Sequence, residues 1–212
     1  MKKNFLLPIA FVLTINFAIA EAPLQVAKLT CEYIENPLGI DVQVPRFNWT
    51  FNSTKRNQFQ SAYEIIVSTN IKDIQQGKGN IWSTGKIISP KNIQVEYTGG
   101  ALRSFTRYYW RVKVYNQNDK ASAWSDLNFF ETAMLHENDW KAKWIFDGSK
   151  NPKHDEDYYK DDRMPLLRKE FNAGKKIASA RLYISGVGYY EAYLNGKKIG
   201  DHVLDPGFTT YK

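Results

Sequence analysis

Residues 108–115 read YYWRVKVY, and this stretch decides the fold. Aromatic or aliphatic side chains at the even-numbered positions alternate with a set at the odd-numbered positions that includes Arg111 and Lys113. An alternation with a period of two residues is typical of a β-strand that buries one face. We therefore predict a strand here.

Similar short runs recur on both sides of this stretch, between Gln25 and Thr132. They lie at 26–33, 46–51, 62–68, 81–86, 93–98 and 128–132, and Gly, Pro, Asn and Asp separate them. About seven strands in roughly a hundred residues is the scale of an immunoglobulin or fibronectin type III sandwich. We expect one helical turn or an irregular loop at residues 71–76. The aromatic residues could serve as core or as a sugar platform, and we expect core, because a small sandwich without disulfides must bury large side chains.

The first twenty residues have the pattern of a signal peptide. Lys2 and Lys3 precede an almost wholly apolar run at 5–19, and Ala18-Ile19-Ala20 supplies the small residues of a cleavage site. Pro8 and Asn16 make this run a poor membrane span. We predict export to the periplasm or the extracellular space, with cleavage after Ala20 and no membrane attachment afterwards. The formal charge of +7 comes from scattered Lys and Arg residues, so we expect no nucleic-acid partner.

The ionisable residues form no familiar catalytic or metal motif. Cys31 is the only cysteine, which excludes a disulfide within the chain, and we expect it to be a small apolar residue on a strand. The three histidines are widely spaced and form no metal pattern. The acidic segment 155–162 offers oxygen ligands for calcium, but neighbouring cations such as Lys160 compete, so a solvated loop is expected. We predict no catalytic residue, no metal ligand and no cofactor, with calcium as the alternative left open.

A second domain follows a polar linker at residues 133–139. Its expected strands are WKAKWI at 140–145, PLLRKEF at 165–171, and the alternating runs 181–185 and 190–194. Asn195-Gly196 supplies the two positive-φ residues of a tight hairpin turn. Alternation would place four side chains on one face of the last strand, and they are our candidates for carbohydrate binding: Tyr189, Glu191, Tyr193 and Asn195. The competing interpretation of this face is a surface that packs against another domain.

Residues 180–212, ARLYISGVGYYEAYLNGKKIGDHVLDPGFTTYK, closely resemble the N-terminal β-sandwich module of bacterial family 78 α-L-rhamnosidases. WKAKWI resembles the opening strand of that module, and YYWRVKV resembles the fibronectin type III strand that carries a core Tyr. The resemblance implies an all-β chain. Its parts would be a signal peptide (1–20), a fibronectin III/Ig-like sandwich (21–133), and the first part of a jelly-roll-like sandwich (134–212).

The same resemblance implies a role. The general acid and base of this inverting glycosidase family lie in a downstream helical domain, whose motifs have no counterpart in this sequence. The chain would then be a non-catalytic accessory portion of a secreted α-L-rhamnosidase. Its partners would be the catalytic domain of the full-length enzyme and a rhamnose-containing polysaccharide. The alternative is a stand-alone carbohydrate-binding or adhesion module.

Overall fold

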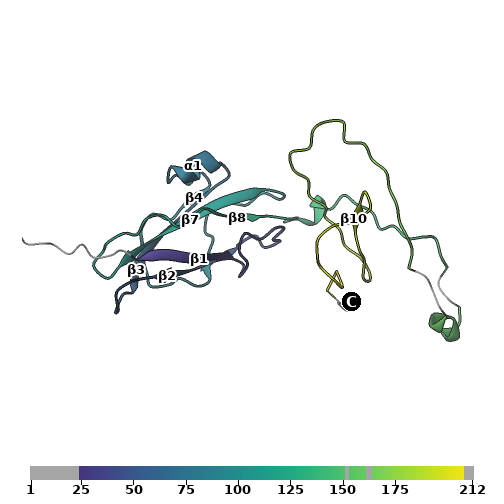
Figure 1. Ribbon diagram of the computed structural model, residues 1–212, viewed down its shortest axis with the longest axis horizontal. Coiled ribbons are helices and arrows are strands. Elements are labelled where there is room, and N and C mark those ends of the chain that lie inside the picture. Colours follow the sequence, from purple (N-terminus) through teal and green to yellow (C-terminus); the bar gives the residue numbers. More distant parts are fainter. Residues whose placement is uncertain (1–23, 151–152, 161–163, 208–212) are drawn as a thin grey trace, which may run out of the picture. The chain divides into compact units, whose positions relative to one another are not determined.

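The computed structural model describes residues 24–150, 153–160 and 164–207 (Figure 1). The predicted signal peptide lies outside these residues. The chain divides into two compact units, one up to Lys143 and one from Trp144, and each is described by itself.

The first unit is a sandwich of two antiparallel sheets. One sheet has the order β1 (Gln25–Cys31), β2 (Arg46–Asn52), β6 (Val95–Glu96). The other has the order β4 (Trp82–Ser83), β3 (Gln60–Ser68), β7 (Arg107–Asn116), β8 (Asn128–Glu131), with β5 (Ile87–Ile88) also paired to β3. The predicted all-β, immunoglobulin-like sandwich is confirmed.

The two sheets enclose an aromatic core. Along β7 the side chains alternate between buried and half-buried, as the YYWRVKVY pattern predicts. The rings of Phe47 and Trp110 lie 4.6 Å apart, and those of Tyr108 and Phe130 lie 5.1 Å apart. These four side chains are almost completely buried, so the prediction that such aromatic residues form the core is confirmed.

Local details of the sandwich follow the sequence closely. The expected helical turn is α1 (Ile71–Gln75), which begins after Asn70, whose side chain accepts a hydrogen bond from the backbone N–H of Lys72. Cys31 is buried at the end of β1, as expected, and this burial raises the pKa of its thiol. The predicted strands 81–86 and 93–98 shorten to β4 and β6, because these edge segments have a hydrogen-bonding neighbour on one side only.

The segment after β8 still contacts the sandwich. Leu135 is buried among core residues, and its backbone N–H donates to the hydroxyl of Ser104 at 3.0 Å. A short 3-10 helix, η1 (Glu137–Asp139), follows. The predicted domain boundary after residue 133 stays a prediction.

In the second unit, the strands of the described residues are β9 (Tyr193–Leu194) and β10 (Lys197–Lys198), which form a hairpin. The turn has φ values of 49° at Asn195 and 78° at Gly196, so the predicted turn is confirmed. The strands predicted at 140–145, 165–171 and 181–185 are wrong for this structure. A strand needs a neighbour to accept and donate its backbone hydrogen bonds, and alternation alone does not supply one. Within the acidic segment, residues 155–159 form the 3-10 helix η2 (Asp155–Tyr159) rather than an open loop.

Candidate functional site

Two of the four predicted carbohydrate-binding residues, Glu191 and Tyr193, meet beside the β9–β10 hairpin. The carboxylate of Glu191 accepts a hydrogen bond from the hydroxyl of Tyr193 at 2.6 Å and another from Nζ of Lys198 at 2.6 Å. The bond from Lys198 lowers the pKa of Glu191, and the bond to Glu191 raises the pKa of Tyr193. Glu191 is therefore a charged acceptor whose two oxygens are both engaged within the hairpin.

The other two candidates are placed differently. Asn195 occupies the hairpin turn, and Tyr189 precedes the Tyr190–Asp205 bridge with about half of its surface exposed. Because β9 spans only Tyr193–Leu194, the structure does not align the four residues along one strand face. It brings Glu191 and Tyr193 together and adds Lys198, which the sequence did not single out. Sugar binding by these residues stays a prediction.

Neither a metal cluster nor a membrane span is found in the part of the chain that the structure describes. Within it, no three His, Cys, Asp or Glu side chains lie close enough together to hold a metal ion. Asp161 and Asp162 of the acidic segment lie outside the described residues, so the alternative of a calcium site stays open. No helix within the described ranges is both long and apolar enough to cross a bilayer.

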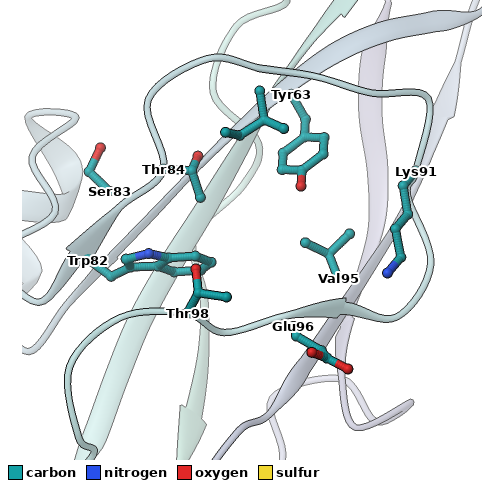
Figure 2. Close-up of a pocket in the computed structure, with 9 residues that line it drawn as sticks. Tyr63, Trp82, Ser83, Thr84, Lys91, Val95, Glu96 and Thr98 are labelled. Carbon is teal, nitrogen blue, oxygen red and sulfur yellow. The ribbon is translucent and has the colours of Figure 1, made fainter.

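The first unit contains a cavity that the sequence did not reveal. It has a volume of about 400 Å³ and lies between the edge strands of the two sheets, β4 and β5 on one side and β6 on the other. Figure 2 shows Tyr63 and Trp82 on its walls, with the hydroxyl of Tyr63 directed into the open space. Val95 forms another wall, and Lys91 and Glu96 belong to its rim.

The loop that frames this cavity is tied to the core. The side-chain amide N–H₂ of Gln60, a buried residue of β3, donates to the carbonyl oxygens of Ser89 and Lys91 at 3.1 and 3.0 Å. The indole N–H of Trp49 donates to Oε1 of Gln60 at 2.9 Å. The backbone N–H of Trp49 also donates to the carbonyl oxygen of Asn92 at 3.0 Å. Residues 89–92 are thereby held at the cavity mouth.

Sequence reasoning assigned the aromatic residues of the sandwich to the core and missed this cavity. Tyr63 fits that assignment, since it is only 8% exposed, yet its hydroxyl reaches the cavity. No sequence signal marks the gap, because it results from the short edge strands β4, β5 and β6 and the loops between them.

The fold defines a class of protein: an all-β module built on an immunoglobulin-like sandwich. Residues 26–136 match the family model described as "Rha78A-like, N-terminal immunoglobulin domain", and residues 175–212 match the model of the α-L-rhamnosidase N-terminal domain. The chain belongs to this family and corresponds to the N-terminal region of α-L-rhamnosidases. The family model is of immunoglobulin type, so the fibronectin type III assignment gains no support from it.

Individual relatives agree with this placement. An α-L-rhamnosidase of Formosa agariphila is 35% identical over 190 residues, which cover 83% of this chain and 20% of the relative. The structure of an α-L-rhamnosidase from Dictyoglumus thermophilum is 37% identical, with a TM-score of 0.76 over 87% of this chain and 22% of that one. The Streptomyces avermitilis α-L-rhamnosidase, solved in complex with L-rhamnose, is 34% identical, with a TM-score of 0.56 over 58% of this chain and 12% of that one. The chain thus spans about a fifth of the length of the first two.

Proposed function

We propose that this chain is the non-catalytic N-terminal portion of a secreted α-L-rhamnosidase and that it works together with the catalytic domain of the full-length enzyme. The observation that carries the proposal is the pattern of coverage. The Formosa agariphila relative matches 83% of this chain, whereas the chain accounts for 20% of that relative. The remaining four-fifths of such an enzyme is where we place the chemistry.

The second unit supports a partner domain. Large apolar side chains there are exposed, among them Leu166 at 99%, Phe146 at 76% and Val203 at 74%. The second unit exposes many such side chains and buries few, which is expected of a segment that another protein surface covers. We infer that further parts of the full-length enzyme cover these side chains.

The substrate and the compartment belong to the same proposal. The terminal sugar would be α-L-rhamnose on a polysaccharide, since the matched relatives are α-L-rhamnosidases. Export rests on residues 1–20, whose charged start, apolar run and small residues at 18–20 have the signal-peptide pattern. The periplasm or the extracellular space would be the destination.

The experiment compares two proteins in one assay. The 212-residue chain and a longer protein that continues into a catalytic domain are purified and incubated with an aryl α-L-rhamnoside. We expect no turnover above the blank from the chain and clear turnover from the longer protein. Turnover by the chain itself that survives rigorous purification would contradict the proposal. So would a longer protein without rhamnosidase activity.

The alternative from the sequence, a stand-alone carbohydrate-binding or adhesion module, is favoured by one observation. This is the cavity beside Tyr63 and Trp82, which lies within the sandwich and does not involve the second unit. The protein exported into the culture is purified, its N-terminus is sequenced and its mass is measured. The mass separates the two candidates, because it shows whether a catalytic domain is attached. A stand-alone module would be secreted without any catalytic domain attached.

A further inference from the structure

We propose that the cavity between β4, β5 and β6 binds a single neutral sugar residue, with the Tyr63 hydroxyl as its fixed hydrogen-bonding group and Trp82 as its apolar wall. The site differs from the one predicted around Glu191. The proposal rests on the proposed function only for the choice of L-rhamnose as the first probe.

The Tyr63 hydroxyl is the first observation. Tyr63 is 8% exposed, and its ring is held edge-on against Trp49 with the centroids 5.2 Å apart. None of the hydrogen bonds within the described residues engages this hydroxyl, which points into the cavity (Figure 2). Burial raises the pKa of Tyr63, so the group is a neutral phenol that can donate and accept. The ring is therefore fixed and almost covered, while its hydroxyl stays accessible at the cavity wall, where a ligand hydroxyl can bond to it.

The second observation is the apolar wall. Trp82 lines the cavity while its ring stacks on Phe47 at 6.1 Å and meets Tyr97 edge-on at 4.9 Å. These contacts fix the orientation of the indole, so little entropy is lost when a ligand packs on it. Val95 and Ile87 add aliphatic surface to the same cavity. Such a wall suits the C–H faces and methyl group of a deoxy-sugar.

The two charges at the rim cancel. Lys91 and Glu96 both line the cavity and both are exposed, and they carry opposite charges. The rim therefore has no net charge to attract an ion, and the hydroxyls of a neutral sugar can accept from Lys91 and donate to Glu96. The volume of about 400 Å³ lies at the lower end of the range for small-molecule sites, which fits one sugar ring better than a long glycan chain.

Gln60 makes the site rigid before any ligand arrives. Its bonds to the carbonyl oxygens of Ser89 and Lys91 fix the loop that carries the rim lysine. The Tyr63 ring is fixed by Trp49, and Trp49 also bonds to Gln60. Hydrogen-bonding group and rim are thus positioned by one buried network, which is the preorganisation that affinity for a small ligand requires.

The test is an NMR titration of the isotope-labelled 212-residue chain with methyl α-L-rhamnoside, followed by two other neutral methyl glycosides. We expect saturable shifts at residues 82–98 and around Tyr63. The variant Tyr63→Phe keeps the ring against Trp49 and removes only the hydroxyl, so it should keep the melting temperature and weaken binding about five-fold.

Tyr97→Phe is the matched control. The Tyr97 hydroxyl also has no hydrogen-bond partner among the described residues, but it is fully buried and does not line the cavity. This control should leave the affinity unchanged.

The outcomes separate this inference from the proposed function. Tyr63-dependent shifts at 82–98 with another neutral glycoside but not with the rhamnoside would support the sugar site and show that its ligand is a sugar other than rhamnose. An absence of saturable shifts up to the solubility limit would overturn the inference. So would shifts confined to residues 189–198, or equal affinities for the Tyr63→Phe and Tyr97→Phe variants. Those results would leave the proposed function standing, since hydrolysis by the longer protein tests it separately.

Discussion

The two units have alternating sequences of similar quality, yet the same pattern has different outcomes in them. In the first unit, Val112 and Val114 of β7 are 0% exposed. In the second, Leu182 and Ile184 alternate in the same way and are 56% and 45% exposed. The local pattern is alike, so the difference has to come from what each segment meets in space.

Partners explain the difference. β7 pairs with β3 on one side, in continuous register from Ala62–Tyr115 to Ser68–Tyr109, and with β8 on the other. Strand pairing in the described part of the second unit is limited to the β9–β10 hairpin and the Tyr190–Asp205 bridge. A two-stranded hairpin is only marginally stable by itself, whereas a sheet of several strands with a buried face can be stable on its own. Alternation therefore predicts which face a strand would bury if it formed. Whether the strand forms depends on neighbouring strands that can pair with it.

The largest expected effect is a difference in amide hydrogen exchange between the two units. Amides in β3 and β7 should exchange only through global unfolding, about 10³-fold or more slowly than unprotected amides. Amides at residues 165–180 should exchange close to the unprotected rate, because this stretch forms no helix or strand. Exchange read by mass spectrometry on the 212-residue chain checks this. Comparable protection in both stretches would mean that the second unit closes its own core.

A core substitution should have the next largest effect. Trp110 is 1% exposed and packs against Phe47, so Trp110→Ala should lower the free energy of unfolding of the sandwich by about 3–5 kcal/mol. Leu166→Ala is the control in the second unit. Leu166 is 99% exposed, and its removal should change the stability by less than about 0.5 kcal/mol. Urea denaturation followed by circular dichroism measures both, and a large effect of Leu166→Ala would contradict the comparison.

The sequence was sufficient for the first unit because its signals were local and mutually consistent. The alternation in 108–115 predicts which side of β7 is buried, and the turn-forming residues at 36–39, 77–80 and 116–119 separate the strands. The Asn195-Gly196 turn was likewise predictable, since left-handed backbone at two successive residues restricts the sequence strongly.

The candidate sites were harder to predict because they depend on distant residues. The cavity joins Tyr63 of β3 with Val95 of β6, which lie in different sheets and are 32 positions apart in the sequence. The Glu191–Lys198 pair depends on the hairpin register, which places the two side chains within 2.6 Å. Alternation predicted that Glu191 and Tyr193 lie near each other, but it could not show that their polar groups bond to one another.

Two glycines with the same backbone conformation sharpen the comparison. Gly77, which follows α1, has φ of 75°, and Gly196 in the hairpin has φ of 78°. A Cβ on Gly77 would lie 3.1 Å from Nε1 of Trp124, whereas nothing lies within 4 Å of one on Gly196. Gly77→Ala should therefore destabilise the sandwich by about 1–2 kcal/mol.

The control for this prediction is Gly196→Ala, whose strain stays within the hairpin. It should move the NMR shifts of residues 193–198 and leave the unfolding midpoint of the sandwich unchanged. A shifted midpoint for Gly196→Ala would show that the hairpin is coupled to the stability of the first unit.

The smallest expected effect concerns two carboxylates, one in each unit, whose pKa values are both lowered by hydrogen bonds from a cation. Glu32 accepts bonds from Arg46 Nε at 3.1 Å and Nη2 at 2.6 Å, and its side chain is only 15% exposed. Glu191 accepts its bond from Lys198 in an exposed hairpin, with 54% of its side chain exposed. The same interaction should therefore matter for stability in the first unit and not in the second.

The pH dependence follows from the direction of the shift. Because the pKa of Glu32 is lower in the folded state, its stabilisation is fully present above the unfolded value of about 4.3 and is lost as the pH falls through the folded value. Glu32→Gln should lower the free energy of unfolding at pH 7 by about 1 kcal/mol, since Arg46 is partly exposed and solvent screens the pair. As the pH falls below about 5, the parent protonates Glu32 and the variant does not, so the variant should lose less stability than the parent.

Glu191→Gln, the control, should leave the unfolding midpoint of the sandwich unchanged at every pH. Urea midpoints measured across this pH range check both variants. A parallel loss of stability in the parent and the Glu32→Gln variant on acidification would contradict the contribution of the Glu32–Arg46 pair.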